Sequence, residues 1–164
     1  MQVKRKPPSA APLRAERRKG GGFPSGEVSY FRERALHAFK KHVAATLVLV
    51  ERATGAVIGF YTLSPLGIDA GDRLPATLLG RMAVGESFRA RGFGGIMLID
   101  ALRRAFENRR TVASIALVVD AKSGQARDFY LHYGFHPFPG HSHWLFIVME
   151  TIGQMLSRVG IGAT

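Results

Sequence analysis

The stretch RARGFGG, residues 89–95, joins a short apolar run to a segment with helical periodicity. It places two arginines and three glycines within seven residues. A glycine loop between a strand and a helix leaves backbone N–H groups unpaired and points the positive end of a helix dipole at its contents. The loop is therefore predicted to bind a phosphate or pyrophosphate, with Arg89 and Arg91 adding full charges.

Two other interpretations of this loop stay open at this point. The glycines can simply allow a helix and a sheet to pack closely. A dinucleotide site expects G-x-G-x-x-G spacing and an acidic ribose ligand about 20 residues further on. Gly92, Gly94 and Gly95 lack that spacing, and Asp120 lies about 30 residues away, which disfavours a dinucleotide.

The segments before the loop predict one helix and three strands. Residues 27–42 carry apolar side chains at helical spacing with a basic outer face. The β-rich runs 45–52 and 56–64 are separated by a short Ala-Thr-Gly turn, which predicts an antiparallel hairpin. A loop is expected at 69–75 and a third strand at 76–84, directly before the glycine loop.

The segments after the loop predict two helices and two strands. Residues 94–108 have a helical apolar stripe, with Asp100 and Arg104 forming an ion pair outside it. The near-continuous apolar run 112–121 is typical of a strand covered on both faces, which favours parallel pairing. A helix at 123–134, ending at Gly134, and a last strand at 143–150 complete a mixed α/β (α+β) sheet with helices on both faces.

Composition points to one soluble domain with a basic tail. The chain has 164 residues, no cysteine, a net charge of +11 and no apolar run of membrane-spanning length. Residues 1–22 hold seven Lys/Arg and are expected to be a disordered tail before a domain at 23–152 and a C-terminal tail at 153–164. The basic tail lacks the apolar core of a secretory signal, so the cytoplasm is expected. The basic charge favours a polyanion such as RNA as partner.

Two motifs together resemble those of the GNAT N-acetyltransferase superfamily. RARGFG fits the pattern Q/R-x-x-G-x-G/A of the loop that binds the pyrophosphate of acetyl-CoA. ARDFYLHYGF, residues 126–135, is similar to the second signature, A-x-x-F-Y-x-x-x-G-F, and follows in the expected order and spacing. The resemblance implies the acyl-CoA N-acyltransferase fold, whose central mixed sheet is splayed between two strands, with acetyl-CoA as acetyl donor.

Further segments resemble the GNAT toxins of type II toxin-antitoxin modules. These are FPSGEVSYF near the N-terminus, VIGFYTLS and LLGRMAV. The resemblance implies transfer of acetyl to the α-amino group of an aminoacyl-tRNA, which blocks translation, a ribbon-helix-helix antitoxin as partner, and a homodimer. The sequence departs from the family pattern at Ser25, where a cysteine is usual, and at Ser123, where wider GNATs often have asparagine.

The resemblance also assigns roles to individual residues. Tyr130 matches the general acid that protonates the departing CoA sulfur, and a backbone N–H near Val84 is the implied oxyanion donor. Binding of acetyl-CoA is assigned to the backbone of the third strand, to the glycine loop with the start of the helix that follows it, and to the first residue of the predicted helix at 123–134. These residues are Met82, Ala83, Val84, Arg89, Ala90, Arg91, Gly92, Phe93, Gly94, Gly95 and Ser123.

No convincing general base stands out. Glu86 lies near the end of the third strand, but an isolated loop glutamate is usually just solvated. An α-amino group, with pKa about 7.7, is partly neutral at pH 7, whereas a lysine amine, with pKa about 10.4, is almost wholly protonated. A site poor in bases therefore suits an α-amine, although a water chain can also serve as base.

Basic residues supply candidates for tRNA contact: Lys40, Lys41, Arg73, Arg81 and Arg127. Each of them can equally be an ordinary surface charge. His132, His136, His141 and His143 lack a neighbouring carboxylate or cysteine, so no metal site is expected. The alternative functions are acetylation of protein N-termini or of a small amine, and a non-catalytic RNA-binding module of the same shape.

Overall fold

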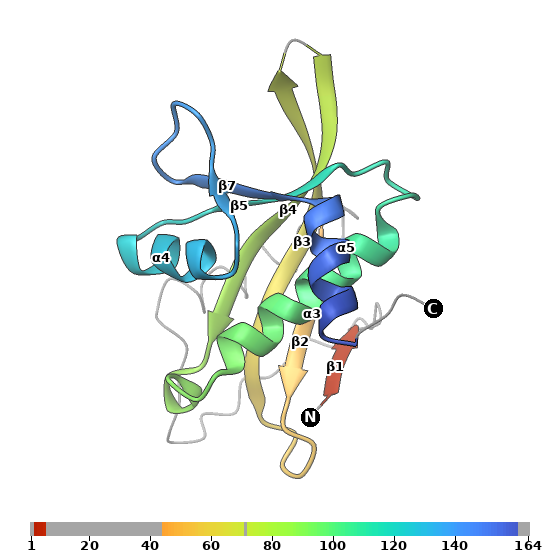
Figure 1. Cartoon of the computed structure of the whole chain (residues 1–164). Coiled ribbons are helices and arrows are strands. Elements are labelled where there is room, and N and C mark those ends of the chain that lie inside the picture. The colour runs from red at the N-terminus through yellow and green to blue at the C-terminus, as the bar shows by residue number, and fades with distance from the viewer. Residues whose placement is uncertain (1, 6–43, 71, 161–164) are drawn as a thin grey trace. The chain divides into compact units, whose positions relative to one another are not determined.

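The structure is a computed structural model that describes residues 2–5, 44–70 and 72–160 (Figure 1). Its strands are β1 (Gln2–Arg5), β2 (Ala45–Val50), β3 (Val57–Ala70), β4 (Asp72–Val84), β5 (Ala116–Asp120), β6 (His136–Pro137) and β7 (Trp144–Val148). Its helices are the 3-10 turn η2 (Glu86–Phe88), α3 (Phe93–Asn108), α4 (Gly124–His132) and α5 (Met149–Arg158).

The strands form one mixed sheet in the order β1-β2-β3-β4-β5-β7-β6. The pairs β1–β2, β5–β7 and β6–β7 are antiparallel, whereas β4 and β5 run parallel. A mixed sheet with α-helices is the predicted fold class, which is therefore confirmed.

The chain divides into two compact units. The first unit comprises residues 1–62 and 81–98, and the second comprises residues 63–80 and 99–164. Strands β3 and β4 and helix α3 contribute residues to both units.

The core of the first unit packs β2 and β3 with the start of α3. Leu47 and Leu49 of β2 and Ile58 and Phe60 of β3 are almost fully buried, as is Met97 of α3. The predicted hairpin between these strands is confirmed. Its turn has the Glu51 N–H donating to the Ala56 carbonyl (2.8 Å), and its glycine adopts a φ of +71° that favours this residue.

The core of the second unit centres on β5. Its residues 116–119 are at most 3% exposed, as the continuous apolar run predicted. One neighbour is β4, with Thr77 opposite Leu117 in the parallel register, and the other is β7, with Leu145 and Ile147 fully buried. The predicted parallel pairing across α3 is confirmed.

Helix α4 begins and ends as its sequence indicates. The Ser123 hydroxyl oxygen accepts a hydrogen bond from the Ala126 N–H (3.1 Å), which caps the helix. Gly134 follows the helix with a φ of +85°, the left-handed conformation in which helices often end. On α3, the expected ion pair between Asp100 and Arg104 is present at 2.8 Å.

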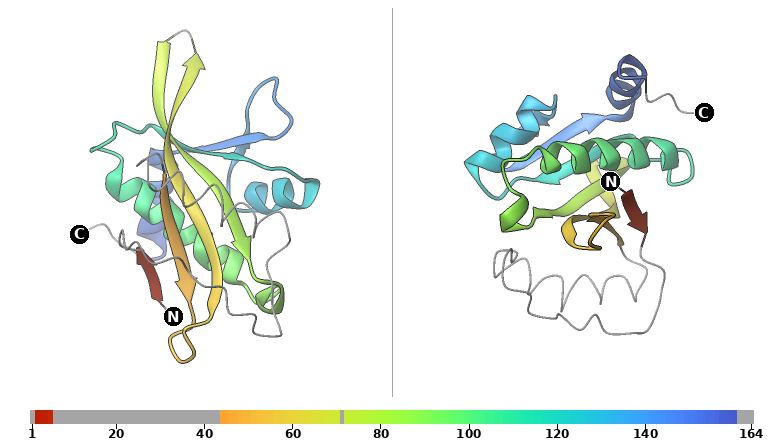
Figure 2. Two further views of the ribbon diagram at one scale, coloured as in Figure 1. Left: turned by 180° about the vertical axis from the view of Figure 1, so that it is seen from behind. Right: turned by 90° about the horizontal axis from the view of Figure 1, so that it is seen from below.

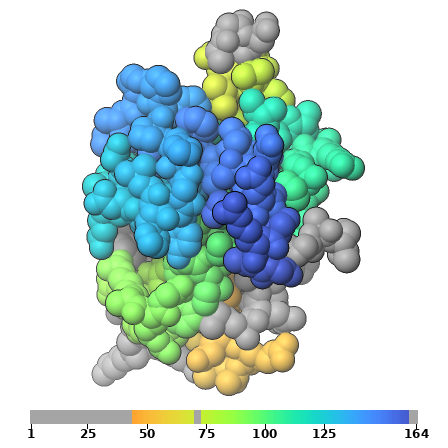
Figure 3. Space-filling view, in the orientation of Figure 1, coloured from red at the N-terminus to blue at the C-terminus, as the bar shows by residue number. Residues whose placement is uncertain are grey.

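Helix α5 corrects the expected tail at 153–164, because residues 153–158 are helical. Met149, Ile152 and Leu156 are buried at helical spacing, and Figure 3 shows the helix in dark blue at the surface of the second unit. A β-carbon at Gly153 would lie 2.7 Å from the Phe106 ring of α3. Gly153 is therefore the residue that lets α5 approach α3.

The prediction of a loop at 69–75 also needs correction. The loop expected at 69–75 is largely strand, since β3 ends at Ala70 and β4 begins at Asp72, and Figure 2 shows residues 63–80 projecting beyond β5 and β7. Pro75 precedes the register of β4 with β5 and needs no N–H there, but its carbonyl accepts from the Ile115 N–H (3.0 Å).

At the N-terminus, residues 2–5 form β1 against β2, so the expected disorder up to residue 22 is wrong for these four. The helix expected at 27–42 lies outside the described residues, as do Ser25, Lys40 and Lys41. Among the described helices, none has the length and apolar character needed to cross a membrane.

Candidate functional site

The glycine loop of the first unit presents free backbone N–H groups. Ala90 and Gly92 have φ values of 56° and 81°, and α3 then begins at Phe93. The N–H groups of residues 93–95 occupy the first turn of α3, where no carbonyl of the same helix can accept from them. The glycine loop therefore lies at the positive end of a 16-residue helix, as its position in the sequence predicted.

Two exposed arginines flank these N–H groups. The Arg91 guanidinium carbon lies 5.6 Å from the centre of the Phe88 ring and 5.4 Å from that of Phe93. The two rings contact each other edge to face, with centres 5.9 Å apart. This stacking holds Arg91 on the loop, and because the first turn of α3 contains no acidic residue, the positive potential there is not neutralised from within the helix.

The end of β4 approaches β3 unusually closely. A β-carbon at Gly59 would lie 2.6 Å from the Ala83 carbonyl oxygen and 2.8 Å from the Met97 sulfur. The Gly85 N–H donates to the Ile58 carbonyl (2.8 Å), which continues the pairing past the end of β4. The backbone of residues 82–84, to which binding of acetyl-CoA was assigned, is thus held from the β3 side.

Strand β4 extends beyond the residues that pair with β5. The parallel register ends at Leu79 opposite Val119, whereas β4 continues to Val84 and β5 stops at Asp120. Glu86 follows in η2 and is exposed, which favours the interpretation of a solvated carboxylate over that of a base.

Tyr130 lies in the second unit, on the inner face of α4. It is 8% exposed, and its ring centre lies 5.2 Å from that of Phe129 and 5.3 Å from that of Phe135. Within the described residues its hydroxyl makes no hydrogen bond, which distinguishes it from a core tyrosine anchored on a carbonyl. Burial raises the pKa of Tyr130 to about 12, so the phenol is neutral at physiological pH and available as a donor.

Ser123 and the predicted tRNA contacts occupy more ordinary positions. The Ser123 oxygen caps α4, which leaves its hydroxyl hydrogen for another acceptor. Arg73 is exposed on the β3–β4 hairpin, and Arg127 of α4 donates from Nε to the Ser142 carbonyl (3.3 Å). Arg81 belongs to the first unit, and its backbone N–H donates to the Thr62 hydroxyl (3.0 Å).

His132 at the end of α4 is exposed, as are His136, His141 and His143 after the helix. The described part of the chain contains no group of three or more His, Cys, Asp or Glu side chains placed to hold a metal ion.

Sequence reasoning missed one pair of residues in the second unit. Asp120, considered only as a ribose ligand, lies directly opposite Trp144 in the antiparallel register of β5 and β7. The alternation in residues 144–148 could have shown that Trp144 avoids the core, since Leu145 and Ile147 are the buried residues. The partner across the sheet could not be read from the sequence.

Comparisons with known proteins agree with this geometry. A family model described as an acetyltransferase (GNAT) domain matches residues 44–137. A tRNA-acetylating toxin of Mycobacterium tuberculosis is 32% identical over 143 residues, which cover 78% of this chain and 84% of the relative.

Two solved structures share the fold. One is a mutant of the toxin AtaT bound to the C-terminus of the antitoxin AtaR and to acetyl-CoA, with a TM-score of 0.73 and 21% identity, covering 82% of this chain and 85% of that one. The other is AtaT complexed with acetyl-methionyl-tRNAfMet, with a TM-score of 0.75 and 18% identity, covering 83% and 89%.

Proposed function

Because the chain belongs to the GNAT acetyltransferase family, we propose that it transfers acetyl from acetyl-CoA to the α-amino group of an aminoacyl-tRNA and so blocks translation. The resemblance found in the two sequence motifs is thereby confirmed at the level of the family. The choice of acceptor is supported by the tRNA-acetylating relative, which matches this chain over most of its length.

The residues of the first unit fit acetyl-CoA. The pyrophosphate carries two negative charges, and the loop offers three unpaired N–H groups together with Arg89 and Arg91. The backbone of Met82, Ala83 and Val84 is proposed to hold the pantetheine amides as a neighbouring strand would. When bound, acetyl-CoA supplies the acetyl group as an activated thioester.

Two groups of the chain then act on the charges that develop during transfer. The backbone N–H near Val84 donates to the oxygen that becomes negative when the amine attacks. Tyr130 donates its proton to the sulfur that leaves. Proton transfer from a phenol of pKa about 12 to a thiolate, whose thiol has a pKa of about 8.5, is uphill by about 5 kcal/mol. The difference between the two pKa values narrows because apolar surroundings raise the pKa of a thiol as well.

The observation that carries the chemistry is the largely buried Tyr130 side chain, whose neutral hydroxyl has no hydrogen-bond partner among the described residues and is not itself a fully buried atom. An accessible hydroxyl at the edge of a buried ring can donate to a group bound beside it. A departing thiolate is an acceptor that suits it.

We further propose a homodimer that is held by a ribbon-helix-helix antitoxin in the resting cell and acts in the cytoplasm. The complex of AtaT with the C-terminus of AtaR supports the antitoxin as a partner, since the two toxins share a fold.

The test is transfer of radiolabelled acetyl from acetyl-CoA to total charged tRNA, with deacylated tRNA as control. We expect label on charged tRNA only, and a loss of about 100-fold or more in the Tyr130→Phe variant, as for removal of a general acid. Label on peptides or small amines in place of charged tRNA would refute this acceptor but retain the enzyme. Binding of acetyl-CoA without transfer to any amine would favour a non-catalytic module.

A further inference from the structure

Asp120 is the last residue of β5 and lies where this strand leaves β4. The last paired residues are Leu79 and Val119, so Asp120 directly follows the end of the shared register. All three residues belong to the second unit. A carboxylate at this point lies beyond the last residue that pairs with β4, while it still pairs with β7.

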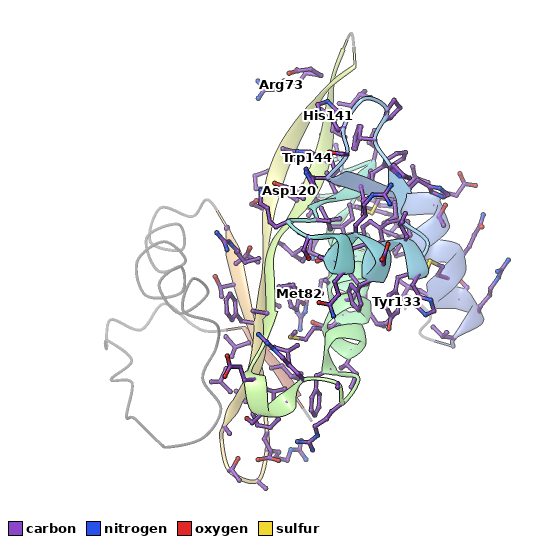
Figure 4. The ribbon with its side chains drawn as sticks, turned by 90° about the vertical axis from the view of Figure 1, so that its left-hand side faces the viewer. Arg73, Met82, Asp120, Tyr133, His141 and Trp144 are labelled. Carbon is purple, nitrogen blue, oxygen red and sulfur yellow. The ribbon has the colours of Figure 1, made fainter. Side chains whose placement is uncertain are left out.

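Trp144 lies directly opposite Asp120 on β7, and Figure 4 shows the two side chains next to each other at this end of the strands. Directly opposed residues of an antiparallel pair place their side chains on the same face, about 5 Å apart at the β-carbons. Neither side chain is fully buried: the Asp120 side chain is 24% exposed, and Trp144 is half-buried. A carboxylate beside an indole makes a small subsite with one charged and one flat apolar wall.

The carboxylate is held by a partner that is easily displaced. Lys122 donates to the Asp120 carboxylate, but the lysine side chain is 78% exposed. Exposed ion pairs of this kind contribute little to stability, because water and salt compete with them. Another amine that enters the subsite can therefore replace the Lys122 ammonium.

The backbone around the subsite is fixed from two sides. The Ala121 N–H donates to the His143 carbonyl (2.8 Å), and Arg127 Nε donates to the Ser142 carbonyl (3.3 Å). These bonds tie the segment after β5 to the segment before β7. The two walls are thus set by the backbone and do not depend on the Lys122 contact.

We propose that Asp120 binds the α-amino group of the acceptor and that Trp144 forms the wall against which the aminoacyl end lies. This inference rests on the proposed function and names the residue that receives its acceptor. A neutral amine donates one N–H to the carboxylate and keeps its lone pair free for attack. The nitrogen becomes positive as the new C–N bond forms, and Asp120 stabilises that charge more strongly than it binds the neutral amine. The nitrogen then loses one proton to solvent water, and the C–S bond breaks as Tyr130 protonates the sulfur, which leaves an amide and the free thiol of CoA. Tyr130 recovers its proton from water.

The same geometry accounts for release of the product. Acetylation converts the amine to an amide, which is neutral and cannot become an ammonium. Before attack the α-amino group is partly an ammonium and competes with Lys122 for the carboxylate as a cation, whereas the amide cannot, so Lys122 returns to Asp120. The subsite therefore distinguishes charged tRNA from both deacylated and acetylated tRNA.

The experiment compares Asp120→Asn with Lys122→Met, because both variants break the same ion pair and only one removes the carboxylate. We expect Asp120→Asn to lower kcat/KM for charged tRNA by about 10- to 100-fold, the usual effect of losing a hydrogen bond to a charged group, with KM for acetyl-CoA unchanged. Lys122→Met should stay within about twofold of the wild type or bind charged tRNA more tightly. Equal losses in the two variants would assign Asp120 a structural role only.

A binding measurement separates this inference from the proposed function. The wild type should bind aminoacyl-tRNA more tightly than deacylated tRNA, and Asp120→Asn should remove that preference while its Tm stays within a few degrees of the wild type. If the wild type acetylates a peptide or small amine in place of charged tRNA, the proposed acceptor fails, and the same two variants are compared with that amine. No difference between them there would overturn the role of Asp120.

Discussion

Gly59 is the position where a single methyl group should disturb the proposed acetyl-CoA site. Its absent β-carbon would lie 2.6 Å from the Ala83 carbonyl oxygen, 2.8 Å from the Met97 sulfur and 2.9 Å from its methyl carbon. Met97 can rotate away, because it is flexible and lies at the start of α3. The carbonyl oxygen belongs to the backbone, so Gly59→Ala must move strand β4 near Ala83.

The cost follows from two opposing terms. Overpacking of a buried site costs about 1–3 kcal/mol, whereas replacing a glycine by alanine in a strand recovers about 0.5–1 kcal/mol of chain entropy. The net loss is about 1–2 kcal/mol, which lowers the Tm of a chain of this length by roughly 2–8 °C. Because the shift falls on the backbone proposed to hold pantetheine, kcat/KM for acetyl-CoA should fall by about tenfold or more.

The assay pairs thermal unfolding with steady-state kinetics, and Gly153→Ala serves as the matched control. Its β-carbon would meet the Phe106 ring at 2.7 Å, a clash of similar size within the second unit, and neither residue is assigned to acetyl-CoA. Both variants should lose Tm, but only Gly59→Ala should lose affinity for acetyl-CoA. Normal acetyl-CoA kinetics in a destabilised Gly59→Ala protein would show that the Ala83 backbone takes no part in binding.

Three further predictions concern stability. The free energy of unfolding of the wild type should fall by about 1.4 kcal/mol per pH unit between pH 10 and 12, because Tyr130 ionises near pH 10 when unfolded and only near pH 12 when buried. Urea unfolding at pH 9 and 11 should show that Tyr130→Phe lacks this part of the decrease. Ala90→Gly should raise the free energy of unfolding by about 1 kcal/mol, since it relieves a φ of 56°; an unchanged or lower Tm would contradict this. Ser123→Ala should lower it by about 1 kcal/mol through loss of the α4 cap, measured by denaturant titration against Ser157→Ala at an exposed site.

Local sequence patterns predicted the elements whose burial or whose ends depend on neighbouring residues alone. The run at 112–121 predicted β5 because a strand covered on both faces needs apolar residues at every position. The cap at Ser123 and the stop at Gly134 could be read directly, since both depend on the local backbone alone. The hairpin at 63–80 was misread because Gly67, Pro75 and the aspartates resemble a loop, whereas β3 continues to Ala70 and β4 begins at Asp72.

The sequence pointed to those residues of the candidate site that lie in contiguous motifs. The glycine loop and Tyr130 each lie within a segment of ten residues or fewer, so their spacing carried the information. The pairing of Asp120 with Trp144 depends on register across two strands separated by a helix and a loop, which no local pattern encodes. The role of Gly59 was hidden for the same reason, since it arises from Ala83 and Met97 on other elements.

The distribution of charge bears on how a tRNA would be held. Residues 1–43 contain eleven of the 23 Lys/Arg and only three of the 12 Asp/Glu, so the remainder of the chain is close to neutral. Phosphate contacts position a nucleic acid without reading its sequence and scale with the number of cations. Under the proposed function, the first 43 residues therefore carry most of the net positive charge that attracts the tRNA backbone. Asp120 and Trp144 then act on the aminoacylated end of the tRNA, where an amine is distinguished from a hydroxyl and from an amide.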